Sequence, residues 1–165
     1  MDISEHSVLL VDDNSDEIFL VERAFLKAGL NVPLHVARDG QEAIDYLSRR
    51  GGPADATGHL PPTLMLLDLK MPRKNGFEVL EWLRQQRGFE KPIVVVLTSS
   101  SLAADINRAY ELGANSYLVK PGEFKTLVDI VKSLASYWLV LNQKPESHGR
   151  SGAGALPSGA QFEAA

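Results

Sequence analysis

The stretch VLLVDDN, residues 8–14, sets four apolar side chains directly before two acidic ones, Asp12 and Asp13. A short, continuous run of apolar residues is typical of a strand buried inside a protein. Two adjacent carboxylates repel each other, so a protein that places them at the end of a buried strand normally has a cation for them. The stretch therefore predicts a buried strand that ends at a cation site.

Five short apolar runs alternate with segments of helical periodicity along the chain. The predicted strands are residues 7–11, 33–37, 63–67, 92–97 and 115–119, and the predicted helices are residues 16–28, 41–50, 76–87, 102–113 and 123–141. Runs that are apolar nearly throughout indicate parallel strands covered by helices on both faces. Strict alternation with right-handed crossovers predicts an α/β fold, a flavodoxin-like, doubly wound, five-stranded parallel sheet of order 2-1-3-4-5 with five helices.

Two segments depart from this alternation. Residues 51–62, GGPADATGHLPP, are predicted to form a Gly/Pro-rich loop, which is long because such connections usually have ~2–6 residues. Residues 143–165 contain few large apolar side chains and many Gly, Ala, Ser and Pro, so they are predicted to be a disordered tail. One domain is therefore expected over residues 1–142, with an output that acts through protein contacts.

The overall composition excludes several classes of function. The chain has 165 residues, a net charge of −4 and no cysteine. The absence of cysteine excludes disulfides, thiolate metal sites and a cysteine nucleophile. The negative charge gives no basis for nucleic-acid binding, and no run reaches the ~18 apolar residues of a membrane span. We expect a cytoplasmic protein whose partners include neither nucleic acid nor membrane.

Polar side chains follow four of the five predicted strands at the point where each strand ends. Asp12 and Asp13 follow the first strand, Asp68 the third, Thr98 the fourth and Lys120 the fifth. Ligands of open parallel sheets bind beyond the carboxyl ends of the strands, so these groups should meet at one edge. Each has a plain structural explanation alone, such as helix capping or surface charge, but their joint placement favours a site.

Three acids, a hydroxyl and an ammonium at one edge suit phosphoryl transfer to a carboxylate. Clustered carboxylates favour Mg²⁺, which screens a nucleophilic carboxylate from the incoming phosphoryl group. Lys120 supplies a second positive charge, and Thr98 can donate to a phosphoryl oxygen. Asp68 is the best candidate for the nucleophile because it lies on the central strand between the two groups.

Four motifs, VLLVDDN, LMLLDLKMPRKNGFEVL, VVVLTSS and ANSYLVKP, carry a family resemblance over roughly residues 5–141. In this order and spacing the chain resembles the receiver domain of two-component response regulators. The resemblance implies that Asp68 accepts a phosphoryl group from a histidine kinase or phosphotransfer protein. It also implies that Mg²⁺ is bound directly by Asp13, Asp68 and the backbone carbonyl of Lys70, and by Asp12 mainly through water.

The resemblance further implies how the signal leaves the site. Thr98 and Lys120 would contact the phosphoryl oxygens, and Tyr117 would turn inward as the switch aromatic. The Lys120–Pro121 bond is expected to be cis, as is usual in this family. Phosphorylation would then shift the population of two states of one face, formed by strand 92–97, helix 102–113, strand 115–119 and helix 123–141.

Two features leave alternatives open. The Lys70 side chain either hangs over the phosphoryl site and changes the dephosphorylation rate, or points to solvent with only its carbonyl in use. The last helix ends in YWLVLN, apolar nearly all round. This end either packs against the first helix or the sheet edge, or forms a homodimer through the face of helix 102–113, strand 115–119 and helix 123–141.

Within the family, the chain resembles the single-domain regulators that partner phytochrome-type histidine kinases, through its loop at 51–62, MPRKNGFEVL and its last helix. It would catalyse only its own phosphorylation and dephosphorylation, and is not expected to be a conventional enzyme. Two rivals remain. One is a haloacid-dehalogenase-like phosphatase, although its nucleophile ends the first strand in an Asp-x-Asp pattern. The other is a pseudo-receiver that docks a partner and is never phosphorylated.

Overall fold

The structure is a computed structural model that describes residues 3, 5–49, 61–88 and 90–145. The predicted loop at 51–62 lies outside the described residues except for its last two positions. The predicted tail at 143–165 likewise lies outside them, apart from residues 143–145.

The described residues form one parallel sheet of five strands, which confirms the predicted order. Its order is β2-β1-β3-β4-β5. The strands are β1 (Val8–Val11), β2 (Leu34–Ala37), β3 (Leu64–Leu67), β4 (Ile93–Thr98) and β5 (Ser116–Val119). In the register of the central strands, Val11 pairs with Leu67 and Leu67 pairs with Val96. The polar residues that follow these strands therefore begin at nearly the same level.

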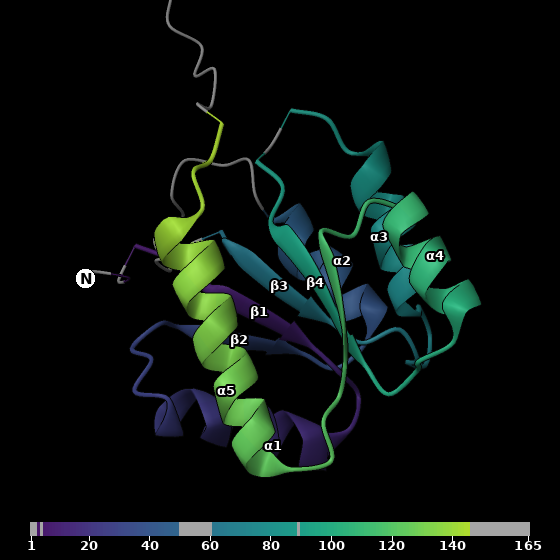
Figure 1. Ribbon diagram of the computed structural model, residues 1–165. Helices are drawn as coiled ribbons and strands as arrows, with labels where there is room; N and C mark the ends of the chain where they lie inside the picture. Colours follow the sequence, from purple (N-terminus) through teal and green to yellow (C-terminus); the bar gives the residue numbers. More distant parts are fainter. Residues whose placement is uncertain (1–2, 4, 50–60, 89, 146–165) are drawn as a thin grey trace, which may run out of the picture.

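Helices connect the strands and cover both faces of the sheet (Figure 1). They are α1 (Ser15–Lys27), α2 (Gly40–Ser48), α3 (Gly76–Gln85), α4 (Ala103–Glu111) and α5 (Phe124–Leu134), and α5 runs on into a π-helical segment, η1 (Ala135–Leu141). Three of them begin at a side-chain cap, because Asn14, Asp39 and Asn75 accept hydrogen bonds from the first-turn N–H groups of α1, α2 and α3.

Alternate residues of each strand enter two separate apolar layers. Leu9 and Val11 pack in the layer that contains buried residues of α2, α3 and α4. Val8 and Leu10 pack in the opposite layer, with buried residues of α1 and α5. Because every residue of β1 and β3 is buried, the continuous apolar runs of the sequence are explained by this double coverage.

Two details differ from the sequence-based expectations. No cis peptide bond occurs among the described residues, so the expected cis form of Lys120–Pro121 is wrong for this structure. The last helix is not α-helical to its end, since the Asn142 N–H donates to the Tyr137 carbonyl, five residues back, at 2.7 Å. The residues of this end are themselves apolar on nearly every side of the helix, so sequence periodicity could not reveal the change of hydrogen-bond pattern. None of the helices in the described part of the chain is both long and apolar enough to span a bilayer.

Candidate functional site

Backbone hydrogen bonds extend the sheet beyond its strands and set two acids side by side. The Asp12 N–H donates to the Ala37 carbonyl at 3.1 Å, and the Asp68 N–H donates to the Val11 carbonyl at 2.9 Å. One carboxylate oxygen from each of Asp12, Asp13 and Asp68 lies within 4.8 Å of the others. Asp12 and Asp68 are only 2% and 7% exposed, whereas Asp13 is exposed. The three predicted acids thus form one cluster with a buried and an open side.

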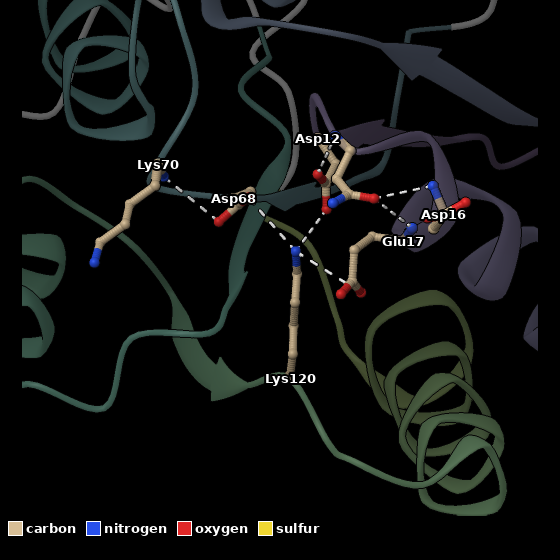
Figure 2. A network of polar contacts seen from close by, with 7 residues as sticks. Asp12, Asp16, Glu17, Asp68, Lys70 and Lys120 are labelled. Atoms are coloured by element: carbon tan, nitrogen blue, oxygen red, sulfur yellow. Dashed lines mark hydrogen bonds and ion pairs between the residues drawn. The ribbon is translucent and has the colours of Figure 1, made fainter.

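Lys120 enters the same cluster from the end of β5 (Figure 2). Its N–H donates to the Thr98 carbonyl at 2.8 Å, which fixes the residue beside β4. Its Nζ lies 2.7 Å from Asp12 Oδ2 and 3.4 Å from Asp68 Oδ2. Burial lowers the pKa of Lys120, but the hydrogen bond to Asp12 and the charge of Asp68 outweigh it, so the pKa is raised. The ammonium therefore stays charged and holds the two buried acids together.

The electrostatics of Asp68 are those of a carboxylate that lacks sufficient positive charge. Burial is the largest effect and raises its pKa; the Lys120 charge opposes this and the Asp12 charge adds to it, and the result is a raised pKa. A further cation at the cluster would favour the ionised form.

Thr98 and Tyr117 lie on the other side of Asp68, on β4 and β5. Thr98 is completely buried, and its hydroxyl has no hydrogen bond of good geometry among the described residues, although its proximity lowers the pKa of Asp68. The half-buried Tyr117 donates from its hydroxyl to the Ser100 carbonyl at 2.8 Å. The loop between β4 and α4 is therefore tied to the aromatic ring while the buried Thr98 hydroxyl remains free to donate.

Lys70 meets the site through its backbone. Its N–H points at Asp68 Oδ1 at 3.5 Å, and its exposed side chain extends away from Asp68 (Figure 2). Of the two alternatives for this side chain, the structure has the one that points to solvent. The turn is tight, because a Cβ atom on Gly76 would lie 2.3 Å from the Asp68 carbonyl oxygen.

Two residues of the site were not singled out from the sequence. Glu17 Oε2 lies 4.0 Å from Lys120 Nζ, and the Asn14 N–H donates to Asp12 Oδ1 at 2.9 Å. The spacing of Asn14 and Glu17 fits a helix cap followed by an acid in the first turn, which is a signal that could have found them. A fourth carboxylate therefore borders the cluster.

The fold and the site together define a class of protein. An open parallel sheet whose carboxyl edge joins three acids, a half-buried lysine and an unpaired hydroxyl is suited to hold a cation and an anionic group together. The chain belongs to the family described as the response regulator receiver domain, which matches residues 8–132. It is thus a two-component signalling domain and not a conventional enzyme. Membership of this family excludes the alternative of a haloacid-dehalogenase-like phosphatase. Receiver domains interact with sensor histidine kinases and bind Mg²⁺ at an aspartate cluster.

Two curated relatives span most of the chain. The "Probable methanogenesis regulatory protein FilR2" of Methanothrix harundinacea is 38% identical over 138 residues, which are 84% of this chain and 86% of that protein. Response regulator Rcp1 of Synechocystis is 35% identical over 132 residues, which are 80% of this chain and 88% of that protein. Both relatives are named as regulators.

Solved structures share the fold at similar identity. The phosphorylated cyanobacterial phytochrome response regulator RcpA has a TM-score of 0.73 and 34% identity, covering 86% of this chain and 99% of that one. The Mn²⁺-bound form of response regulator Rcp1 has a TM-score of 0.71 and 33% identity, with the same coverage of both chains. The similarity to regulators associated with phytochromes, first suggested by sequence motifs, is confirmed.

Proposed function

We propose that this chain is a phospho-accepting response regulator in which Asp68 receives a phosphoryl group from a sensor histidine kinase. The observation that carries the proposal is the placement of Asp68. It is 7% exposed, has a raised pKa, and lies between two further acids and the Lys120 ammonium. A buried carboxylate with this surplus of negative charge is suited to act on phosphorus only when cations flank it.

The proposed metal is Mg²⁺, held by Asp12, Asp13, Asp68 and the Lys70 carbonyl. Three carboxylate oxygens within 4.8 Å of one another approach the ~4 Å that separates opposite ligands of one ion with ~2.1 Å bonds. A hard oxygen donor set without nitrogen or sulfur favours this class of cation. The relative Rcp1 has a structure in its Mn²⁺-bound form, which supports a divalent site here. When bound, the ion would supply charge that screens the carboxylate from the phosphoryl group.

The proposed chemical step is a displacement at phosphorus. One carboxylate oxygen of Asp68 forms a bond to phosphorus as the phosphorus–nitrogen bond of the donor phosphohistidine breaks. The leaving nitrogen keeps the electron pair of that bond and departs as neutral imidazole when its other nitrogen carries a proton. Lys120, now paired with Asp12 and Asp68, would contact one phosphoryl oxygen, and the free Thr98 hydroxyl would donate to another.

The proposed output is a shift between two arrangements of α4, β5 and α5. A Thr98 side chain drawn toward the phosphoryl group would vacate space beside Tyr117. Tyr117 is half-buried and is held by one hydrogen bond to Ser100, so a modest free energy can move it inward. The switch assignment of Tyr117 rests on this weak attachment.

The proposed partner is a sensor histidine kinase of phytochrome type, as the name of RcpA suggests for that relative. Two apolar side chains of α1, the helix that follows Asp12 and Asp13 in the chain, are exposed: Phe19 by 56% and Leu20 by 37%. Exposed apolar side chains on this helix suit a protein donor more than a small molecule. Histidine kinases take their phosphoryl group from ATP, so the proposed location is the cytoplasm.

We also propose a homodimer through the α4, β5 and α5 face. The apolar end of the last helix is only partly covered, since Leu139 is 6% exposed but Tyr137 and Leu141 are 54% and 63% exposed. Val119, on the edge strand β5, is 43% exposed. Sedimentation at high micromolar concentration, with and without a phosphate mimic, tests this. Monomer under both conditions would remove the dimer.

The central proposal is tested by incubating the full chain with acetyl phosphate and Mg²⁺ and recording its intact mass. We expect a gain of one phosphoryl group, lost in Asp68→Asn and when the metal is chelated. The matched control is Asp105→Asn, which removes another carboxylate of the same edge outside the cluster. A chain that gains no mass would be the pseudo-receiver, and a gain that survives Asp68→Asn would place the acceptor elsewhere.

A further inference from the structure

The loop from Leu69 to Asn75, here named the acceptor loop, is anchored at two points. Its first anchor is close to the site, where the Gly76 N–H donates to the Leu69 carbonyl at 2.9 Å. A second anchor joins it to the turn between β2 and α2, 34 residues earlier in the chain. This second anchor has no part in the chemistry proposed above.

The second anchor consists of Asp39 and Arg73. The Arg73 guanidinium donates from both Nε and Nη2 to Asp39 Oδ2, with the Nε contact at 2.8 Å. The other oxygen, Oδ1, accepts from the Glu42 N–H at 2.9 Å and caps α2. The Asp39 side chain is 9% exposed although that of Arg73 is 61% exposed. A buried carboxylate whose two oxygens are both engaged is a fixed point for the loop.

Beside this ion pair, a backbone hydrogen bond and close backbone packing join the same two loops. The Gly40 N–H donates to the Lys74 carbonyl at 2.9 Å, and a Cβ on Gly40 would lie 2.3 Å from that oxygen. Burial raises the pKa of Asp39, but the hydrogen bonds from Glu42 and Arg73 outweigh it and the pKa is lowered. The carboxylate therefore stays ionised and keeps its partner.

The backbone conformation of Arg73 is unfavourable for an arginine, so its side chain must account for its presence at this position. Arg73 has φ of 60°, the one non-glycine residue with positive φ among those described. Glycine or asparagine adopts this conformation more readily than arginine. The contact to Asp39 therefore accounts for an arginine at a position where the backbone alone favours another residue.

Only Met71 and Pro72 separate Arg73 from Lys70, whose carbonyl is a proposed metal ligand. The ring of Pro72 fixes its own φ, so this short link transmits the position of Arg73 to Lys70. We propose that Asp39 and Arg73 are positioning residues that hold the Lys70 carbonyl over Asp68 and so set the affinity for the divalent cation. This inference rests on the proposed function, because it concerns the same metal site.

A purely electrostatic effect of Arg73 and a positioning role predict opposite changes in the affinity for Mg²⁺. Removal of a cation near an acidic cluster should strengthen binding of Mg²⁺. Removal of a positioning contact should weaken it, and loss of such outer contacts typically lowers metal affinity about 10-fold or more. Arg73→Gly is the decisive variant, because it relieves the backbone and removes the tether at once.

The experiment measures the Kd for Mg²⁺ by calorimetric titration of the full chain, together with the unfolding midpoint without metal. Arg73→Gly and Arg73→Ala should each raise the Kd about 10-fold, with Arg73→Lys between them and the wild type. Asp39→Asn keeps the cap on α2 but loses the charge, and should resemble Arg73→Lys. The matched control is Arg38→Ala, which deletes a neighbouring guanidinium that donates to the Ser15 hydroxyl and should leave the Kd unchanged or lower.

A purely structural role is distinguished by the metal dependence of phosphorylation. In Arg73→Gly, slow phosphorylation by acetyl phosphate should return to the wild-type rate at saturating Mg²⁺, while the metal-free unfolding midpoint is equal to or above that of the wild type. A Kd for Arg73→Gly equal to that of the wild type would overturn the positioning role alone. A wild-type chain that neither binds Mg²⁺ nor gains a phosphoryl group would instead overturn the proposed function.

Discussion

The two sides of the site are enclosed to very different degrees. On one side, all residues of β1 and β3 are buried, and α1 buries four side chains. On the other, no residue of β5 is fully buried and α4 buries only Ala109. We call β1, β3 and α1 the anchored side, and α4 and β5 the loose side. Asp12, Asp13 and Asp68 follow strands of the anchored side, whereas Tyr117 and Lys120 belong to the loose side.

This difference suggests how the proposed phosphorylation of Asp68 could change the position of α4 and β5. Elements with few buried contacts open and rearrange at lower free energy than core strands. Under the proposed function, the acids would need a fixed frame to hold a cation at set distances, whereas the residues that respond to phosphorylation would need to move. The site is therefore built across the border between a stiff and a soft part of one sheet.

The largest expected effect compares a leucine on each side. Leu66→Ala, in a fully buried position of β3, should lower the free energy of unfolding by about 3 kcal/mol, since a cavity remains in a packed layer. Leu118→Ala, in a half-buried position of β5, should cost about 1 kcal/mol because solvent already reaches it. Urea denaturation measures both. Equal losses would mean that the two sides do not differ in stability.

The second effect concerns the cation on the anchored side. At a Mg²⁺ concentration of about 100 times Kd, the wild type should gain about 2.7 kcal/mol of stability, because only the folded cluster binds the ion. Asp13→Asn should lose most of this gain while unfolding near the wild-type midpoint without metal, since Asp13 is exposed. Thermal unfolding with and without Mg²⁺ checks it. Asn107→Ala, an exposed change on α4, serves as the control and should keep the full gain.

A third prediction uses the raised pKa of Asp68, whose ordinary value is 3.8. Between that value and the raised one, the folded chain holds a proton that the unfolded chain has lost. The contribution of Asp68 to stability therefore falls as pH rises through this window and is constant above it. Without metal, the stability of the wild type minus that of Asp68→Asn should fall in the same way. A difference that rises with pH over this window would contradict the raised pKa.

The smallest effect is expected at Lys70. Because its side chain extends into solvent, Lys70→Asn should change the lifetime of the phosphorylated chain by less than about 2-fold, within the range of ordinary surface substitutions. Loss of the phosphoryl group after removal of acetyl phosphate measures this lifetime. A change of about ten-fold or more would show that the side chain returns to the site once phosphorus is present.

Much of this arrangement could be predicted because parallel strands end at one edge. The apolar runs indicated β1, β3 and β4. Asp12, Asp13 and Asp68, which follow β1 and β3, meet in the cluster, and Lys120 joins them from the end of β5. What escaped prediction depends on loop geometry. The contact of Asp39 with Arg73 joins two turns and requires a left-handed residue, which neither periodicity nor spacing reveals. The direction of the Lys70 side chain is similarly a property of the folded turn.

The π-helical end of the last helix escaped for a different reason. Its residues are apolar on nearly every side, so the sequence carries no periodic signal there that could separate one helical hydrogen-bond pattern from another. The loop predicted around residues 51–60 and the disordered tail predicted for residues 146–165 stay predictions, since these residues lie outside the described part of the chain.

The ion pairs of Lys120 bear on whether the chain can fold without a bound metal ion. Its ammonium already bridges two of the acids at 2.7 and 3.4 Å, so folding need not wait for a scarce ion to neutralise them. The fold is therefore expected to form without a bound metal, unlike that of zinc fingers, which are unfolded without theirs. Under the proposed function, the ion would control the phosphorylation of the chain and not its folding.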